Sequence, residues 1–498
     1  MTVVKTVGEL SELIGAAAPG GSESFAISDV CYNSKAAVKG SLFVAMKGSG
    51  ADGHNYIIDA VSCGAAVVVA ERAPSEKLPD GVWLLLTEDS RKALALIADW
   101  YCGRPTERMK VVGVTGTNGK TTSTYIISSV MNAAGRPCGK IGTTGREFKG
   151  KNTPLDNTTP ESLDLQKMMK EMEDEGASCC AIEVSSHALD QGRVNGVRFS
   201  TAAFTNLTQD HLDYHGGMEN YFDAKTKLFT EHSPKASVIN ADDPYGARLA
   251  KLAKGNVITY GLSPSLDICA EDVTVSVKGV SMKIKTPSES VEISSSLAGR
   301  HNVYNLLTSA AVAYAEGVGM GKFAEGIASL KAAPGRFEKV EKGQPFAVIV
   351  DYAHTPDALE NVLVTARNIA NGKIITVFGC GGDRDKKKRP LMGRVAWTLS
   401  DSAIVTSDNP RTEDPNMIIE EILKGVEANG NPSGALKVIP DRRDAIREAM
   451  AQAKEGDIVL IAGKGHEDYQ IIGKTKSHFD DREEAAKAIL EVYGQVQR

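Results

Sequence analysis

Short apolar runs rich in β-branched residues alternate along the chain with longer segments in which apolar positions recur every three or four residues. The short runs are typical of buried strands, and the longer segments are typical of helices that cover a sheet. Alternation of this kind predicts an α/β protein with mostly parallel sheets. We predict strands at 40–46, 65–70, 110–115, 179–184, 204–215, 348–351, 373–378, 403–407 and 457–461, and an exposed hairpin at 286–296. Helices are predicted at 3–16, 56–64, 93–101, 161–176 and 297–318.

The predicted elements form three groups. A chain of 498 residues is too long for one hydrophobic core, and its length favours about three domains. Gly103-Arg104-Pro105 and Ala333-Pro334-Gly335-Arg336 have the composition of hinges. We therefore predict a small N-terminal α/β domain at 1–106, a central domain at 107–335 and a C-terminal Rossmann-like α/β domain at 336–498.

Composition removes several classes of function. The net charge of -6 offers no basic surface for nucleic acid or for an anionic membrane. No apolar run approaches the ~20 residues of a membrane span, and no signal-peptide core is recognisable. Eight cysteines without C-x-x-C spacing indicate buried, reduced thiols. We expect a cytoplasmic monomer that binds small molecules, with neither nucleic acid nor membrane as a partner.

The strongest chemical signal follows the strand at 110–115. The chain continues as Gly116-Thr117-Asn118-Gly119-Lys120-Thr121-Thr122 and then takes on helical spacing. Strand, glycine-rich turn and helix together form a P-loop, in which backbone N–H groups and a helix N-terminus converge on phosphate. Val114 stands where the strict pattern has glycine, and a glycine turn with an incidental lysine is the alternative. Since all three parts agree, we predict a P-loop ATPase-like parallel sheet, with Lys120 on the β/γ-phosphates and the Thr121 hydroxyl on Mg²⁺.

Polar residues lie at the carboxyl ends of several other predicted strands. Glu183 lies within a very apolar strand, where a carboxylate needs a cation, and Mg²⁺ beside the P-loop is that cation. His211 and His215 lie close to Asp210, which favours a functional site over isolated core histidines. By composition alone, Lys225 is a solvated helix lysine and 386–389 is a solvated helix start. Thr159, before Pro160, is predicted to cap the helix at 161–176.

Five motifs, in this order, resemble the Mur ligases, the ATP-dependent amide-forming enzymes of peptidoglycan synthesis. They are Gly116–Thr122, Glu183-Val-Ser-Ser-His187, His301-Asn-Val-Tyr-Asn305, Asp351-Tyr-Ala-His-Thr-Pro356 and Gly463-Lys-Gly-His-Glu467. The chain is most similar to members that extend UDP-N-acetylmuramoyl-L-alanyl-D-glutamate by a third residue. The loop Asp408-Asn409-Pro410-Arg411 has the form of members that add meso-diaminopimelate. The resemblance therefore implies ATP, Mg²⁺ and an acyl-phosphate intermediate.

The resemblance also implies roles for individual residues. Lys120, Lys225 and His211 would be catalytic. Mg²⁺ would be bound by Thr121, Glu183, His211 and Lys225, the last as N6-carboxylysine (a carbamate). ATP would be bound by Gly116, Thr117, Asn118, Gly119, Lys120, Thr121, Thr122, His301, Asn302, Asn305, Arg336 and Asp351.

The remaining implied roles concern the other two substrates. The N-terminal domain would be a uridine-binding domain, although Asn33-Ser34-Lys35 replaces the usual Asp-Ser-Arg. The UDP-substrate would be bound by Ser34, Ser49, Gly50, Ala51, Asn157, Thr158, Thr159, Ser185, Gln191 and Arg193. Diaminopimelate would be bound by Arg384, Asp408, Asn409, Pro410, Arg411, Gly463 and Glu467.

Three alternatives stay open. A lysine-adding Mur ligase or a folylpolyglutamate synthase shares the P-loop and the domain plan. Arg411 disfavours the lysine-adding ligase, and the N-terminal domain together with the loop Asp408–Arg411 disfavours the folate enzyme. A P-loop ATPase that uses hydrolysis for motion belongs to another class, and it has no need of the polar loops in the third domain.

Overall fold

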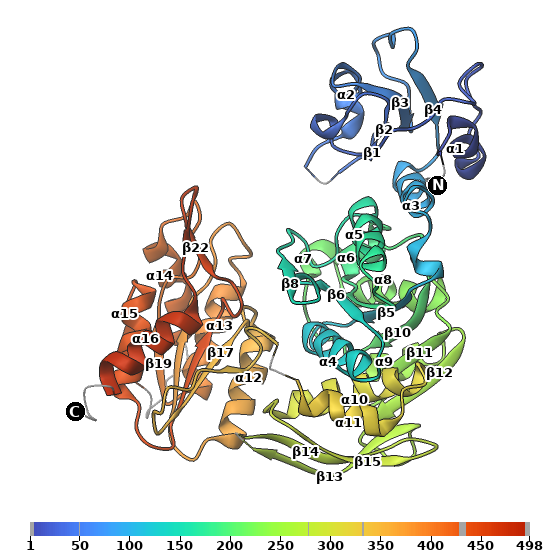
Figure 1. Cartoon of the computed structure of the whole chain (residues 1–498). Coiled ribbons are helices and arrows are strands. Elements are labelled where there is room, and N and C mark those ends of the chain that lie inside the picture. The colour runs from blue at the N-terminus through green and yellow to red at the C-terminus, as the bar shows by residue number, and fades with distance from the viewer. Residues whose placement is uncertain (1–3, 49, 277, 331–332, 428–434, 494–498) are drawn as a thin grey trace.

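Three sheets covered by helices and a separate two-stranded hairpin make up the part of the chain that the structure describes (Figure 1). The structure is a computed structural model and describes residues 4–48, 50–276, 278–330, 333–427 and 435–493. The predicted α/β class with three domains is confirmed. Within the described residues, no helix has the length and apolar character needed to cross a membrane. All eight cysteines are free thiols, and Cys63 is the exposed one among them.

The N-terminal domain has a parallel sheet in the order β1-β2-β3-β4. Its strands are β1 (Val30–Cys31), β2 (Ser41–Val44), β3 (Ala65–Ala70) and β4 (Trp83–Leu86). Its helices are α1 (Val7–Ile14), α2 (Ile57–Ser62) and α3 (Ser90–Tyr101), with short 3-10 turns η1 (Ser34–Ala36), η2 (Gly53–Tyr56) and η3 (Pro105–Glu107). The helix expected from residue 3 begins at Val7, where Thr6 caps it.

The central domain is built on a sheet of 11 described strands in the order β15-β14-β13-β12-β11-β10-β5-β9-β6-β7-β8. The strands are β5 (Lys110–Thr115), β6 (Cys138–Gly142), β7 (Gly145–Phe148), β8 (Lys151–Thr153), β9 (Cys179–Glu183), β10 (Phe199–Phe204), β11 (Ala236–Asn240), β12 (Asn256–Gly261), β13 (Ile268–Ser276), β14 (Gly279–Lys285) and β15 (Ser290–Ser295). From β13 to β6 the pairing is parallel, whereas both margins are antiparallel.

Helices cover both faces of this sheet. Apolar side chains of α4 (Lys120–Ala133), α10 (Arg300–Ala315) and α11 (Met320–Ala328) bury one face. The other face is covered by α5 (Ser162–Asp174), α6 (Ser186–Asp190), α8 (Met218–Thr230) and α9 (Pro244–Leu249), and α7 (Leu212–His215) precedes α8. Because β5, β9 and β10 are adjacent and parallel, the loops after all three meet at one edge.

The C-terminal domain has the sheet order β16-β17-β21-β18-β19-β20, with only β16 antiparallel among the described strands. The strands are β16 (Glu338–Lys339), β17 (Ala347–Asp351), β18 (Ile374–Phe378), β19 (Ser402–Val405), β20 (Ala435–Val438) and β21 (Ile458–Ala462), with a separate hairpin of β22 (Tyr469–Ile472) and β23 (Thr475–His478). Helices α12 (Pro356–Ile369), α13 (Lys388–Leu399) and α14 (Pro415–Glu427) cover one face, and α15 (Arg442–Gln452) and α16 (Asp481–Tyr493) cover the other.

Four local predictions were wrong in informative ways. The strand expected at 204–215 is absent from that segment, because β10 ends at Phe204 and is followed by a loop and the short helix α7. Glu161, not Thr159, caps α5, because the Thr159 hydroxyl instead bonds the backbone of Glu183. The charge run at 386–389 leads into α13 with Lys386 and Lys387 exposed, as predicted, but Arg389 is fully buried and pairs with Glu413 and Glu421. The hairpin at 286–296 contributes β15 alone, since its partner strand β14 ends at Lys285.

Candidate active site

The P-loop connects β5 to α4 in a conformation that requires glycine at both of its ends. Gly116 has φ +148°, and a Cβ there would lie 1.9 Å from Thr205 Oγ1. Gly119 has φ +88°, and a Cβ there would lie 2.4 Å from Asn305 Oδ1. The loop therefore packs directly against the segment after β10 and against α10. Residues 117–122 line a cavity, with the N-terminus of α4 facing it.

Lys120 folds back over the mouth of this loop. Its ammonium donates hydrogen bonds of 2.8 Å to the carbonyl oxygens of Gly116 and Thr117. Burial lowers the pKa of Lys120, and the nearby carboxylates of Glu183 and Asp210 oppose that effect. The side chain is held where a phosphate bound by the loop would meet it.

Glu183 is a buried carboxylate at the end of β9 and is 1% exposed. Its oxygens accept hydrogen bonds from the Thr121 hydroxyl (3.0 Å) and from the Thr143 N–H (3.0 Å) and hydroxyl (3.1 Å). These donors are neutral, so a hard cation would complete the charge balance. Mg²⁺ takes few protein ligands and keeps phosphates or waters. Among the described residues there is no group of three or more His, Cys, Asp or Glu side chains placed to bind a metal. Glu183 and the Thr121 hydroxyl are a ligand set of the small size that Mg²⁺ takes from a protein.

Lys225 is buried, not solvated. It lies on α8, is 2% exposed, and donates a 3.0 Å hydrogen bond to the carbonyl oxygen of Gly116. Its ammonium lies 4.6 Å from the centre of the Tyr221 ring. Burial, assisted by the charge of Lys120, lowers the pKa of Lys225 well below its usual value. Burial therefore favours the neutral amine form of this side chain over the ammonium.

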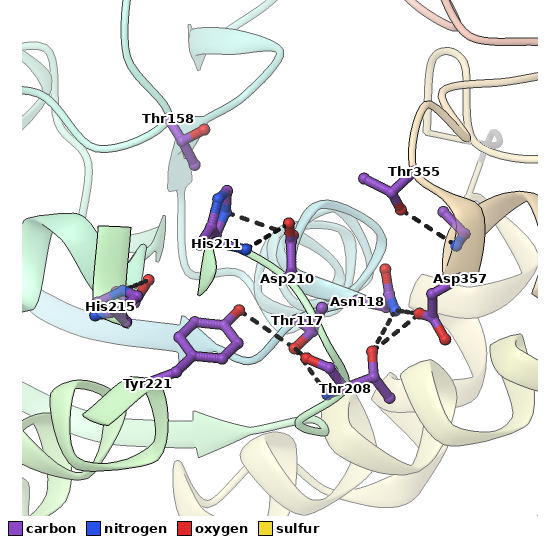
Figure 2. A network of polar contacts seen from close by, with 12 residues as sticks. Thr117, Asn118, Thr158, Thr208, Asp210, His211, His215, Tyr221, Thr355 and Asp357 are labelled. Atoms are coloured by element: carbon purple, nitrogen blue, oxygen red, sulfur yellow. Dashed lines mark hydrogen bonds and ion pairs between the residues drawn. The ribbon is translucent and has the colours of Figure 1, made fainter. Parts of the chain in front are cut away.

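His211 follows the β10 loop with φ +52° and lies beside Asp210 and Tyr221 (Figure 2). Its Nε2 is 3.4 Å from a carboxylate oxygen of Asp210. Burial lowers the pKa of His211 to about 4, against the attraction of Asp210 and with help from His187 and the two lysines. The imidazole is thus neutral at pH 7, the form that can bind a metal.

A cavity of about 240 Å³ lies between the central and C-terminal domains. It gathers many of the predicted residues, namely Thr117, Asn118, Gly119, Lys120, Thr121, Thr122, Thr158, Glu183, Ser185, His211, Lys225 and Arg336. Sequence reasoning missed other lining residues, namely Thr143, Ser186, Asp210, Tyr221, Tyr352, His354, Thr355 and Ala358. Tyr352 and His354 lie inside a motif that the sequence already singled out, which was a usable signal. Tyr221 had no signal beyond its place in an amphipathic helix.

Other residues predicted to bind ATP support the loop or the hinge. Asn305 presses against Gly119 and donates to Asn302 Oδ1 at 2.8 Å. His301 points instead to Thr365 on α12, with 3.3 Å between Nδ1 and Oγ1. Asp351 accepts hydrogen bonds from the N–H groups of Phe337 (2.7 Å) and Ala353 (2.8 Å), so it braces the turn that carries Arg336.

The residues assigned to the UDP-substrate fall into two groups. In the central domain, Arg193 donates to Gln191 Oε1 (2.7 Å) and to the Thr159 carbonyl (3.0 Å), and the Ser185 N–H donates to the Thr159 hydroxyl (3.1 Å). Thr158 lies at the cavity, and Asn157 is exposed. In the N-terminal domain, Ser34 is buried, Gly50 and Ala51 are exposed, and Ser49 lies outside the described residues.

Arg91, which was not predicted, links those two groups. Its guanidinium donates to the carbonyl oxygen of Lys47 (3.1 Å) in the N-terminal domain. It also donates to the Glu161 carboxylate (3.3 Å) in the central domain. Arg91 therefore links Lys47 of the N-terminal domain to Glu161 and to the Gln191 carbonyl of the central domain.

The residues assigned to diaminopimelate form a second cluster, at the carboxyl ends of β19 and β21. Asn409 donates a 2.8 Å hydrogen bond to Glu467, and Arg411 donates a 2.7 Å hydrogen bond to the Gly382 carbonyl. Gly463 has φ +119°, and a Cβ there would lie 2.7 Å from Asp408 Oδ2. Burial, reinforced by Asp408, raises the pKa of Glu467. Pro410 is buried in this loop, whereas Arg384 is exposed and bonds the Asp383 carbonyl.

Comparison with known proteins identifies close relatives along the whole chain. The family models for the Mur ligase middle domain and for the Mur ligase glutamate ligase domain match residues 114–313 and 335–465. The UDP-N-acetylmuramoyl-L-alanyl-D-glutamate--2,6-diaminopimelate ligase of Geobacter metallireducens is 48% identical, with 97% of this chain and 98% of that protein covered. The ligase of the same name from Geobacillus kaustophilus is also 48% identical, with 92% and 94% covered.

Solved structures of Mur ligases also match this chain over most of its length. A structure of a UDP-N-acetylmuramoyl-L-alanyl-D-glutamate--2,6-diaminopimelate ligase matches with a TM-score of 0.72 and 32% identity, covering 98% of this chain and 99% of that one. MurF from Acinetobacter baumannii matches with a TM-score of 0.67 at 20% identity, covering 92% and 96%, which shows a shared fold.

Proposed function

Since the chain belongs to the Mur ligase family, we propose that it adds meso-diaminopimelate to UDP-N-acetylmuramoyl-L-alanyl-D-glutamate in peptidoglycan synthesis, with ATP as the energy source. One observation carries this proposal. Two relatives with that name align with 97% and 92% of the chain at 48% identity, which is long enough to include all three domains. The P-loop cavity and the cluster at Asp408–Arg411 supply the two chemical functions that the reaction needs.

A carboxylate is a poor electrophile, and the P-loop cavity is suited to activating it. The carboxylate oxygen of the dipeptide attacks the γ-phosphorus of ATP, ADP leaves, and an acyl phosphate forms. Lys120, the amides of the loop and Arg336 face the position where negative charge develops during this transfer. The amine of the incoming amino acid then attacks the carbonyl carbon, phosphate leaves, and the nitrogen loses a proton.

Glu183, Thr121 and His211 would hold Mg²⁺ on one wall of the same cavity. The metal would supply charge neutralisation for the triphosphate. The chain contributes a buried carboxylate, a hydroxyl 3.0 Å from it, and a neutral imidazole.

We propose that Lys225 carries a carbamate in the active enzyme. Its neutral amine attacks CO₂, a C–N bond forms, and a proton is lost, which turns a buried amine into an anionic oxygen ligand. The lowered pKa of Lys225 favours the amine form that this step requires. Incubation with ¹³C-bicarbonate should give a carbamate signal in NMR that is absent in Lys225→Gln. A plain lysine in fully active enzyme would refute this assignment.

Amino-acid-dependent phosphate release from ATP tests the function. With the UDP-muramoyl dipeptide present, meso-diaminopimelate should release phosphate rapidly and L-lysine should do so poorly. Omission of either substrate should abolish turnover, which separates a ligase from an ATPase that uses hydrolysis for motion. Preference for L-lysine would identify a lysine-adding ligase, and activity on a folate would identify a folylpolyglutamate synthase. Size-exclusion chromatography tests the expected monomer.

A further inference from the structure

Lys464 is a fully buried lysine in the loop after β21, between Gly463 and Gly465. Its ammonium donates a 3.1 Å hydrogen bond to Asn409 Oδ1. The same nitrogen lies 3.6 Å from a Glu467 carboxylate oxygen and 4.0 Å from an Asp408 carboxylate oxygen. The same ammonium lies 5.6 Å from the centre of the Tyr469 ring. Because its side chain is 0% exposed, Lys464 does not itself face a ligand, and an effect on binding must pass through its neighbours.

The contacts of Lys464 decide which way the Asn409 amide faces. Asn409 Oδ1 accepts hydrogen bonds from the Lys464 ammonium and from the backbone N–H of Ile471 (2.9 Å). Both of those groups can only donate, so the oxygen must occupy that position. The NH₂ group then faces Glu467, to which it donates at 2.8 Å. An amide NH₂ carries two hydrogens, and Glu467 takes one of them.

The charges of the cluster balance only if Lys464 is included. Asp408 and Glu467 contribute two negative charges, and Lys464 and Arg411 contribute two positive charges. A neutral cluster with an acidic part and a basic part complements an amino-acid head, which carries one ammonium and one carboxylate. Without Lys464, these two neighbouring carboxylates would keep only the cations of Arg411 and Arg442, and Arg442 is already paired with Asp481.

We propose that Lys464 is a positioning residue for the amino-acid substrate, which holds Asn409 as a donor and Glu467 as an anion so that the cluster binds a zwitterionic head group. The proposal rests on the function proposed above and names the residue that organises its specificity pocket. The hairpin of β22 and β23 supports the arrangement, since Ile471 contacts both Asn409 and the backbone of Arg411.

The proposal predicts a pH dependence of substrate binding. Burial and Asp408 raise the pKa of Glu467, while Lys464, the Asn409 amide and Arg411 lower it. The remaining groups around this carboxyl are Arg442, Tyr352 and Tyr469. Loss of the Lys464 charge would raise the pKa of Glu467 further. A protonated Glu467 no longer attracts an ammonium, so KM for the amino acid should rise as pH falls, and this rise should begin at a higher pH in the variant.

Steady-state kinetics with meso-diaminopimelate test the proposal. Lys464→Met should raise KM by ~10- to 100-fold with little change in kcat. The lost charge-assisted contact stabilises the bound substrate and the transition state equally, so its removal weakens binding without slowing the chemical step. The KM of this variant should also recover at alkaline pH. Lys474→Met, at the exposed turn between β22 and β23, is the matched control and should give the wild-type KM and pH profile.

Asn409→Asp provides a second variant that keeps an acceptor for Lys464 but removes the donor to Glu467. It should also raise KM for meso-diaminopimelate, and the rise of KM on acidification should begin at a higher pH than in the wild type. An unchanged KM in either variant, or a lowered melting temperature of Lys464→Met without any shift in the pH profile, would overturn the proposal. Wild-type enzyme without diaminopimelate-dependent turnover would instead refute the proposed function, so the two failures are distinguishable.

Discussion

Asn118 in the P-loop donates a 3.1 Å hydrogen bond to the carboxylate of Asp357, in the first turn of α12 (Figure 2). Thr208 donates to the same carboxylate oxygen at 2.9 Å. The phosphate-binding loop of the central domain is therefore joined directly to the C-terminal domain. The contact also places an anion beside the loop that receives the triphosphate, and it occupies the Asn118 amide.

Asp357→Ala should strengthen nucleotide binding. The substitution removes a negative charge near the position of the phosphates and frees the Asn118 amide. If the freed amide forms one hydrogen bond with the nucleotide, the Kd for a non-hydrolysable ATP analogue should fall by ~3- to 10-fold. Isothermal titration calorimetry measures the change. Glu360→Ala, at an exposed position of the same helix, is the control and should leave the Kd unchanged. A weaker affinity in Asp357→Ala would show that the carboxylate assists nucleotide binding.

Lys120→Met should abolish acyl-phosphate formation while the protein stays folded. Its ammonium is the P-loop cation, and loss of a preorganised charge at a phosphoryl-transfer site costs roughly 10²- to 10³-fold in kcat or more. Phosphate release measures the loss, and circular dichroism checks the fold. Turnover close to that of wild type would exclude a catalytic role for the loop.

Arg411→Ala should reduce discrimination between meso-diaminopimelate and L-lysine. A guanidinium can form two parallel hydrogen bonds with the distal carboxylate that lysine lacks, and an unpaired polar group can reject an analogue by roughly 10⁴-fold. The measurement is the ratio of kcat/KM for the two amino acids. An unchanged ratio in Arg411→Ala would remove this arginine from the specificity site, and Arg447→Ala on the exposed face of α15 controls for nonspecific effects.

Arg442 and Asp481 form a fully buried ion pair with two 2.7 Å hydrogen bonds, and Arg442 also bonds the Ala462 carbonyl at the end of β21. Arg442→Met should destabilise the C-terminal domain by about 3–5 kcal/mol, since it leaves a buried carboxylate without a partner. Thermal melting measures the effect. The double variant Arg442→Met/Asp481→Leu should recover much of the loss, and equal or greater destabilisation would show that packing, not the unpaired charge, is responsible.

Local features were readable from the sequence because their causes are local. The P-loop depends on a strand, two glycines and a helix start within about a dozen neighbouring residues, and β5 runs over Lys110–Thr115 as predicted. Glu183 was recognised as a buried carboxylate from the apolar run around it, and it is 1% exposed. Periodicity and turn residues likewise predicted the α/β class, because they reflect which face of each element is buried.

Tertiary structure alone decided which remote residues meet and which charges are buried. Asn118 and Asp357 are 239 positions apart, and only the packing of two domains brings them together. Lys225 and Arg389 have the local sequence of solvated helix residues, yet neighbouring elements bury both and supply their partners. Thr159 has the pattern of a helix cap, but β9 offers its hydroxyl a carbonyl to bind. Burial and pairing of this kind depend on the surfaces of elements far away in the chain, and no local pattern contains that information.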